Sequence, residues 1–397
     1  MNKQDIPALT GLRGIAATLI VIHHVGLIML PLRESAFAAA LGKCGLLGMT
    51  LFFVLSGFVI HYNYGEKLHV GSFGVVRRFA WARFARLYPL YFVFVIANFV
   101  FNMVVLNAPE RGATLRAFPF NILGVQSWFY MVIDGRNVSI SQFMASVAWS
   151  VSTEAMLYLL FIPLALAIDF GKKSAPRGIA IVIVAMVGRA LTIAIADYAP
   201  ITNWMEMHWG ISPEFGAGHW LIYYAPYTRW FEFMAGVGLS DIYRARALGP
   251  RRRPVAATLA LFGAAYIVAS VLDRTVFDLP ALFSVNNAIY AGYAIAVPLV
   301  LYWVCTHPQS LFGQSRVLLF IGEISYPLYL LHIDLMSRFR LSSHGGLLYI
   351  VSKTSAYLIA LFVLAWLVHR YFEMPAKRKI MEIYLRSAGP TRLVADK

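Results

Sequence analysis

The feature that most constrains this chain is the recurrence of apolar runs long enough to cross a lipid bilayer. A helix needs about 20 residues, at about 1.5 Å of rise each, to span the hydrocarbon core. Ten such runs occur, approximately at residues 10–31, 45–64, 88–107, 149–169, 178–197, 219–242, 255–272, 285–306, 317–336 and 347–369. The sequence therefore predicts an all-α, polytopic membrane helical bundle of about ten transmembrane helices.

Composition points to the same class. Hydrophobic residues make up 59% of the 397 residues and charged residues only 13%, and the mean hydropathy is +0.66. Soluble globular chains carry about 25% charged residues. The deficit excludes a disordered or collagen-like chain and argues strongly against a water-soluble globule. We expect an integral protein of a bacterial inner membrane.

The basic charge follows the predicted topology. A formal net charge of +15 could indicate nucleic-acid binding, so the placement of the basic residues decides its meaning. Most of the 34 Lys and Arg residues fall in alternate loops, which are cytoplasmic if both termini are inside. This bias matches the positive-inside rule. The sequence predicts two cytoplasmic termini, and no nucleic-acid partner is needed to explain the charge.

The first span contains ionisable side chains, which are costly inside a bilayer and are therefore functional candidates. Arg13 and His24 are eleven residues apart, so on a helix they share one face, separated by about 16 Å. This arrangement suits a channel with a cation near one mouth and a general base deeper inside. The structural alternative is that His23 or His24 only bonds a neighbouring helix.

Two further spans carry ionisable groups to a similar depth. Glu154 follows the start of the fourth span, and His332 lies in the outer half of the ninth. Glu154 could act in catalysis or could cap its helix, because acidic residues complement the dipole near a helix N-terminus. For His332 the pattern favours a supporting or structural role. The sequence does not show whether these groups face His24.

A basic segment precedes the third span. Arg83 and Arg86, at i and i+3, lie on one side of a predicted interfacial helix, and Arg77 and Arg78 come one and a half turns earlier. Guanidinium pairs suit the phosphates of a nucleotide-bearing cofactor or of lipid headgroups, and without a family assignment lipid contact is favoured. Close helix packing explains Ser56-Gly57 in the second span. No spacing of His, Cys, Asp or Glu predicts a metal site.

Taken together, these segments resemble the acyltransferase-3 family of integral membrane acyltransferases over nearly the whole chain. The resemblance rests on five motifs in order, which are Leu9-Thr10-Gly11-Leu12-Arg13-Gly14 followed by His24, Phe52-Phe53-Val54-Leu55-Ser56-Gly57-Phe58, Arg83-Phe84-Ala85-Arg86-Leu87-Tyr88-Pro89, Trp149-Ser150-Val151-Ser152-Thr153-Glu154 with Tyr158, and Ser325-Tyr326-Pro327-Leu328-Tyr329-Leu330-Leu331-His332. It implies O-acylation, commonly O-acetylation, in which an acyl group moves from cytosolic acyl-coenzyme A to a hydroxyl of a glycan or a glycosylated small molecule.

Two departures qualify the resemblance. Members often have Asp where this chain has Thr10, and an acidic pair plus Gln where it has Glu154-Ala155-Met156, so Glu154 lacks its usual neighbour. Some members also carry a fused extracytoplasmic domain. We expect a membrane acyltransferase domain over residues 1–375 and a cytoplasmic basic tail over 376–397, acting alone or with a separate protein.

The resemblance and the buried polar groups assign the following roles. The catalytic residues are His24 and Glu154. Residues expected to bind acyl-coenzyme A are Arg13, Ser56, Arg77, Arg78, Arg83 and Arg86. Residues expected to bind the acceptor or to support the site are Trp149, Tyr326 and His332. No metal is expected, and the remaining partners are membrane lipids.

The runner-up function is a carrier or flippase for a glycolipid or polysaccharide, which would use the same polar interior without covalent chemistry. The sequence shows no internal repeat and no pair of interrupted helices in matching halves, which argues against a transporter. A lipid-facing receptor or scaffold explains the spans but leaves Arg13, His24 and Glu154 without a use.

Overall fold

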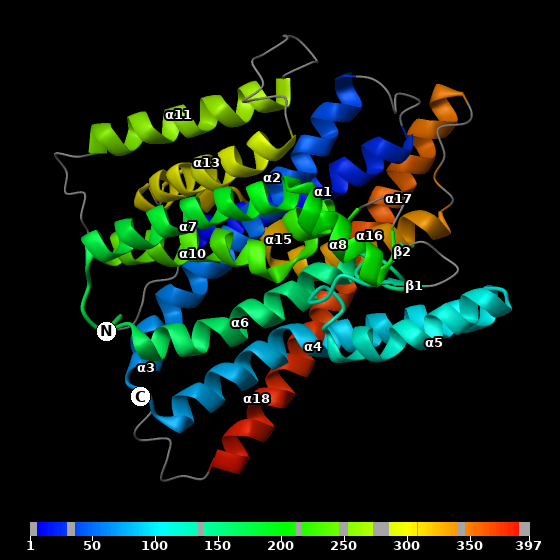
Figure 1. Cartoon of the computed structure of the whole chain (residues 1–397), viewed down its shortest axis with the longest axis horizontal. Coiled ribbons are helices and arrows are strands. Elements are labelled where there is room, and N and C mark those ends of the chain that lie inside the picture. Colours follow the sequence, from blue (N-terminus) through cyan, green and yellow to red (C-terminus); the bar gives the residue numbers. More distant parts are fainter. Residues whose placement is uncertain are drawn as a thin grey trace. The chain divides into compact units, whose positions relative to one another are not determined.

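The computed structural model describes residues 6–29, 36–133, 138–211, 216–245, 253–272, 286–307, 309–339, 341 and 346–388. These residues are almost entirely helical, with one short hairpin (Figure 1). They divide into two compact units. The first takes in the described parts of 1–62, 173–187 and 232–369, and the second those of 63–172, 188–231 and 370–397.

The predicted all-α membrane bundle is confirmed. Seven helices in the described part of the chain are long and apolar enough to cross a membrane, and they are Pro7–Leu27, Ala40–His69, Phe73–Val105, Ser146–Ala167, Ala175–Asp197, Pro254–Leu272 and Leu348–Ser387. Each overlaps one of the ten runs found in the sequence. The other three runs are helical as well, but each departs from a single straight span.

The run at 317–336 is a broken helix. It consists of α15 (Arg316–Glu323) and α16 (Ser325–Arg338), which bend by 70° at the break. Pro327 explains the position of the break, because its ring clashes with the carbonyl four residues earlier, at Glu323, and it has no N–H to donate. The expectation of one continuous span here was wrong.

Of the two remaining runs, one is divided and the other is shortened. The run at 219–242 divides into α9 (Ala217–His219), a π-helical turn η3 (Trp220–Tyr224) and α10 (Pro226–Arg244). The run at 285–306 forms α13 (Asn286–Thr306), of which Ala291–Thr306 is the apolar stretch that the structure supports.

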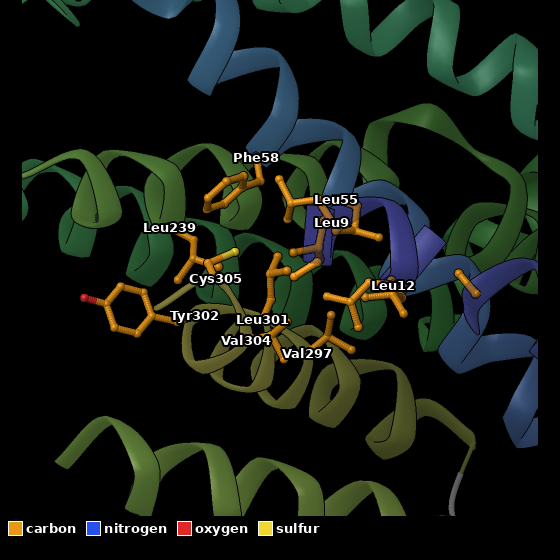
Figure 2. Close-up of a cluster of buried hydrophobic side chains, with 14 of the residues drawn as sticks. Leu9, Leu12, Leu55, Phe58, Leu239, Val297, Leu301, Tyr302, Val304 and Cys305 are labelled. Atoms are coloured by element: carbon orange, nitrogen blue, oxygen red, sulfur yellow. The ribbon is translucent and has the colours of Figure 1, made fainter. Parts of the chain in front are cut away.

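The first unit is built around its N-terminal helix. Besides α13, α15, α16 and the second part of α10, its elements are α1 (Pro7–Met29), α2 (Ala36–Ile60), the first part of α7 (Ala175–Asp197), α11 (Arg253–Leu272), α14 (Leu311–Gln314) and α17 (Leu347–Val368). Helix α1 contacts α2, α13, α14, α15, α16 and α17. Figure 2 shows part of the resulting apolar core, where side chains of α1, α2, α10 and α13 meet.

Glycines let two helices of this unit touch backbone to backbone. A Cβ atom on Gly57 of α2 would lie 1.9 Å from the carbonyl oxygen of Phe233, and one on Gly236 of α10 would lie 2.0 Å from that of Val54. The sequence indicated close packing at Gly57. Its partner Gly236 is identified only by the structure.

A buried polar cluster ties together three helix ends of the first unit. Arg177 donates to both carboxylate oxygens of Asp241, at 2.7 and 2.9 Å. His61 Nδ1 lies 2.9 Å from Ser240 Oγ, and its Nε2 lies 3.9 Å from Asp241. These residues flank loops that the topology assigns to one side of the membrane, so the cluster is consistent with that assignment.

The second unit is organised by one long helix. Its elements are η1 (His61–Gly65, from Asn63 onward), α3 (Glu66–His69), α4 (Phe73–Val105), α5 (Ala108–Leu123), β1 (Val132–Ile133), β2 (Val138–Ser139), η2 (Ser146–Ala148), α6 (Trp149–Ala167), the second part of α7, α8 (Ala199–Trp209), α9, η3, the start of α10, η5 (His369–Glu373, from Arg370 onward) and α18 (Met374–Ala388). The antiparallel hairpin pairs Val132 with Ser139 and Ile133 with Val138. Helix α4 contacts α3, α5, α6 and α18.

The segment expected to be a basic tail is structured in its first part. Helix α18 packs on α4 and continues to Ala388, and residues 389–397 lie outside the described part of the chain. On the other predicted side of the membrane, the Tyr130 hydroxyl donates to the carbonyl of Gly210 at 3.0 Å. This bond joins two loops that the topology places together.

Candidate active site

In the first unit, one face of α1 lies against the broken helix. Arg13 reaches α15 and His24 reaches α16, so both residues point to the same neighbouring segment. The eleven-residue spacing predicted this shared face. Because α15 and α16 bend at Ile324, the two contacts fall on the two arms of the break.

The central feature of this face is a pair of imidazoles. His332 Nε2 lies 3.1 Å from His24 Nδ1, and the two ring centres are 4.9 Å apart. His332 is fully buried, whereas His24 is partly exposed. The sequence placed these groups at similar depth, and the structure brings them into contact. This contact also fits a histidine that only bonds a neighbouring helix, so the catalytic role of His24 stays a prediction.

The hydrogen bonds define which ring nitrogens carry protons. His24 Nδ1 faces the carbonyl of Ile20 at 3.0 Å, and His332 Nδ1 faces the carbonyl of Tyr329. A carbonyl only accepts, so in neutral rings both Nδ1 atoms are protonated. His332 Nε2 then accepts from His24 Nδ1, and the basic lone pair of His24 remains on Nε2. The single Nδ1 proton of His24 is shared between the Ile20 carbonyl, which sets the tautomer, and His332, which helps to orient the ring.

His23 supports this pair from the other side. Its Nδ1 lies 2.9 Å from the carbonyl of Leu41 on α2, and its ring stands edge-on to His24, with the ring centres 4.6 Å apart. A Cβ atom on Gly45 would lie 2.6 Å from the His23 ring. Gly45 therefore leaves room for the imidazole.

Arg13 secures the break between α15 and α16. Its Nη2 donates to the carbonyl of Gly322 at 2.9 Å, and the Ser325 hydroxyl donates to the same oxygen at 2.8 Å. Carbonyls at a helix C-terminus lack intrahelical partners and carry partial negative charge, which a guanidinium complements. Arg13 thus has a structural role, whether or not it also binds a ligand.

Two more expected residues, Ser56 and Tyr326, lie in or beside this region. Ser56 is partly exposed on α2, directly before the tightly packed Gly57. Phe52, one turn earlier, makes an edge contact with the Tyr329 ring, with centres 6.1 Å apart. Tyr326, in the first turn of α16, is 8% exposed.

Glu154 belongs to the second unit, where Tyr158 holds it. The Tyr158 hydroxyl donates to a Glu154 carboxylate oxygen one turn away on α6. Glu154 does not cap this helix, since α6 begins at Trp149 with Ala148 in the capping position. This geometry removes the capping alternative. The expected meeting of Glu154 with His24 stays a prediction.

Arg83 is enclosed by aromatic rings. Its Nη2 donates to the Tyr64 hydroxyl at 3.2 Å. The guanidinium carbon lies 5.1 Å from the Tyr64 ring centre, 5.7 Å from that of Tyr158 and 6.0 Å from that of Phe79. Ring faces attract cations. Arg83 therefore packs on the same tyrosine that holds Glu154.

The other basic residues of α4 meet α18. Arg86 forms an ion pair with Glu373, whose side chain is 2% exposed. Arg77 lies over the Tyr384 ring at 5.1 Å, and Arg78 is partly exposed beside it. Glu373 was not among the residues expected from the sequence. Its only signal was an isolated acid at the start of a strongly basic segment.

Trp149 lies in an aromatic cluster around η3. Its ring centre is 5.0 Å from that of Tyr223 and 4.9 Å from that of Tyr224. Arg229 Nε donates to the carbonyl of Tyr223 at 2.8 Å, and Thr153 donates to that of Tyr224 at 2.9 Å. These donors satisfy carbonyls of the irregular turn, which sequence periodicity could not reveal.

A hydrogen-bonded imidazole inside a helical membrane bundle is a group able to act as an acid, a base or a nucleophile, as a membrane enzyme would require. The chain belongs to the acyltransferase-3 family, whose "Acyltransferase domain" matches residues 6–370. The family indicated by the five motifs is thereby confirmed. No solved structure matches the chain.

Several relatives are named as acyltransferases or O-acetyltransferases. Acyltransferase MdmB of Streptomyces mycarofaciens is 27% identical over 94% of this chain and 92% of its own length. Peptidoglycan O-acetyltransferase OatA of Listeria monocytogenes is 23% identical over 85% of this chain but only 50% of its own. O-acetyltransferase OatA of Staphylococcus aureus is 26% identical over 95% and 58%. The protein is an integral membrane O-acyltransferase.

Proposed function

We propose that the protein transfers an acyl group, and specifically acetyl, from cytosolic acyl-coenzyme A to a hydroxyl of a glycan or glycosylated small molecule. Two of the relatives are named for O-acetyl transfer, and one of these for peptidoglycan as its acceptor. The relative of similar length is named only as an acyltransferase. The peptidoglycan relative supports a carbohydrate-bearing hydroxyl compound as the acceptor.

His24 Nε2 performs the central step in one of two ways. As a base it takes the acceptor hydroxyl proton while the oxygen attacks the thioester carbonyl. The C–S bond then breaks, and the proton passes to the departing sulfur, giving an ester and the coenzyme A thiol. As a nucleophile it takes the acyl group itself and passes it to the hydroxyl in a second step. In both routes the Ile20 carbonyl keeps the proton on Nδ1, and His332 helps to orient the ring.

The donor is held by cationic side chains. Arg77 and Arg78 bind its phosphates, and Ser56 and Arg13 line the way for the pantetheine arm along α1. The face from Arg13 to His24 is about 16 Å long, which an extended pantetheine arm can largely cover. Arg83 and Arg86 support donor binding indirectly, because Arg83 packs on Tyr158 and Arg86 pairs with Glu373.

The remaining groups act on the acceptor. Glu154, oriented by Tyr158, accepts hydrogen bonds from the acceptor or orients its hydroxyl, and Trp149 and Tyr326 support binding. The observation that carries the whole proposal is the His24–His332 pair, since it leaves one basic nitrogen on a membrane-buried imidazole in an acyltransferase.

Mass spectrometry of surface glycans and secreted glycosides tests this function. The comparison uses cells with the protein, without it, and with His24→Ala, and His208→Ala on the exposed face of α8 is a matched control. We expect one acyl increment to disappear in the deletion and in His24→Ala, and to persist in His208→Ala. The His24→Ala protein must still reach the membrane at normal amounts.

Two outcomes contradict the proposal. Normal acylation in His24→Ala removes His24 from the reaction. Unchanged acylation in the deletion, together with altered export of an intact glycan, indicates a carrier instead. A covalently acylated His24 peptide in a rapidly quenched reaction would select the two-step route.

A further inference from the structure

Helix α18 lies along the first turns of α4, in the second unit. At one end the Tyr384 hydroxyl donates to the carbonyl of Gly74 at 3.4 Å, and at the other Glu373 pairs with Arg86. The two segments therefore run in opposite directions, side by side (Figure 1). The family match ends at residue 370, so α18 lies beyond the matched part of the chain.

The paired segments are strongly basic. Residues 73–86 and 371–388 together contain eight Lys and Arg residues and two acidic residues, Glu373 and Glu382. Glu373 is engaged by Arg86. Arg378, Lys379 and Arg386 are exposed. Such a concentration of one charge sign attracts anions and raises their local concentration.

Helix geometry places part of this charge at the junction of the two helices. Lys377 lies four residues after Glu373 and seven before Tyr384, and both of those residues contact α4. Residues at these spacings share one helix face. Lys377 therefore lies on the α4 side, where it is partly buried. Arg77 comes from the facing helix, and its buried Nε has no hydrogen-bond partner among the described residues.

An aromatic ring completes the surface. Trp81 is 36% exposed, and its ring centre lies 6.3 Å from that of Tyr384, the ring that Arg77 covers. Indole rings stack on nucleobases, and guanidinium groups bind phosphates in a bidentate manner. A basic strip beside an exposed indole matches a phosphorylated nucleoside better than a simple anion.

We propose that α18 and the first turns of α4 bind the 3′-phosphoadenosine end of the acyl donor. Arg77, Lys377 and Arg378 contact its phosphates, and Trp81 stacks on its adenine. The inference rests on acyl-coenzyme A being the donor and extends that function to α18. The same phosphate chemistry is offered by an anionic lipid headgroup, so the test has to separate the two sources.

Binding to the purified full-length protein in detergent tests the donor. The probes are acetyl-coenzyme A and 3′-dephospho-acetyl-coenzyme A, and the variants are Arg77→Gln with Arg378→Gln, and Trp81→Leu. Lys172→Gln, an exposed basic residue of the same unit, is the control. We expect the unmodified protein to bind the phosphorylated form about tenfold more tightly, the size of a good charge-assisted contact.

Each variant has a distinct expected result. The double arginine variant loses the preference for the 3′-phosphate, while Lys172→Gln keeps it. Trp81→Leu weakens both ligands by about the same factor, roughly fivefold to tenfold, because it removes base stacking alone. Size-exclusion profiles and unfolding temperatures establish that each variant is folded.

Other results would overturn the inference. Equal binding of the two ligands by the unmodified protein, or a preference that survives the double substitution, removes α18 from donor recognition. Native mass spectrometry of the protein in lipid nanodiscs identifies the other source of phosphate. If the double variant retains fewer phosphatidylglycerol molecules but keeps the 3′-phosphate preference, the surface binds lipid headgroups and not the donor. Absence of any acetyl-coenzyme A binding would instead contradict the donor assigned under the proposed function.

Discussion

The two polar regions of this protein satisfy their buried groups in different ways. Around His24, the imidazoles and Arg13 bond mainly to backbone carbonyls, those of Ile20, Tyr329, Leu41 and Gly322. Around Glu154, the partners are side chains, since Tyr158 holds the carboxylate and aromatic rings enclose Arg83. Unsatisfied polar groups are costly in a membrane, so both regions must pair them.

The two regions should therefore differ in how well they tolerate substitutions. Backbone carbonyls are held by the helices and cannot follow a displaced side chain, so the His24 region depends on fixed geometry. Tyrosine rings can shift with their neighbours, so the Glu154 region should adapt to modest changes. We therefore expect substitutions near His24 to cost more activity than substitutions of similar size near Arg83.

The largest effect is expected from His332→Phe. It removes one of the two acceptors that face His24 Nδ1, the other being the Ile20 carbonyl, and it keeps a ring in the fully buried position. Misplacing a catalytic group by about 1 Å can cost about 10²-fold in rate, and we expect a loss of that size in glycan acylation. Tyr357→Phe, which removes only a bond to the His332 carbonyl at 2.9 Å, is the control and should keep most activity. Near-normal acylation by His332→Phe would show that His24 does not need this partner.

A smaller effect is expected from Arg83→Met. The change leaves a side chain of similar length but removes the cation that packs on Tyr158, so Glu154 loses part of its orientation. We expect acylation to fall about tenfold, which corresponds to the loss of roughly one cation–ring contact. Acetyl-coenzyme A affinity should change less than about twofold, because Arg83 acts through Tyr158. A selective loss of donor affinity would instead indicate that Arg83 binds the phosphates of acetyl-coenzyme A.

Two glycines of α2 test the geometry near His24 more finely. A Cβ atom at Gly45 would approach the His23 ring to 2.6 Å, whereas one at Gly42 would meet nothing within 4 Å. Gly45→Ala must move His23 against His24, and we expect activity to fall about fivefold. Gly42→Ala should leave activity unchanged. Equal behaviour of the two variants would show that His23 can move without disturbing its neighbour.

The smallest effect on activity is expected from Glu373→Gln, which acts mainly on stability. Breaking a fully buried ion pair costs about 3–5 kcal/mol, but the Arg86 side chain is 19% exposed and water compensates part of the loss. We expect unfolding of the detergent-solubilised protein to become easier by about 1–2 kcal/mol. Lys172→Gln, which affects an exposed ion pair with Asp169, should change stability much less. Comparable losses in both variants would mean that the pair does not anchor α18.

Much of the architecture could be predicted because the signal for a membrane helix, a long apolar run, lies in neighbouring residues. The apolar runs located seven spanning helices, and the eleven-residue spacing placed Arg13 and His24 on one face. The broken helix could also have been anticipated. Pro327 is visible in the sequence, but apolar periodicity alone treated 317–336 as one span.

Contacts between distant segments could not be predicted. His24 and His332 are separated by 308 positions, and Arg86 and Glu373 by 287. Their pairing depends on which helices pack together, and no local pattern encodes that choice. The role of Glu154 was also open from the sequence, although its partner is only four residues away. Only the structure distinguishes a bond to Tyr158 from a helix cap.

By itself the sequence determined the environment and the family, because hydropathy, helical periodicity and short motifs are properties of neighbouring residues. The tertiary structure decided the chemistry available at each polar group. It brought His332 to His24, enclosed Arg83 and paired Arg86 with Glu373. The physical reason is that a buried polar group takes whichever partner the packed helices bring within hydrogen-bonding distance.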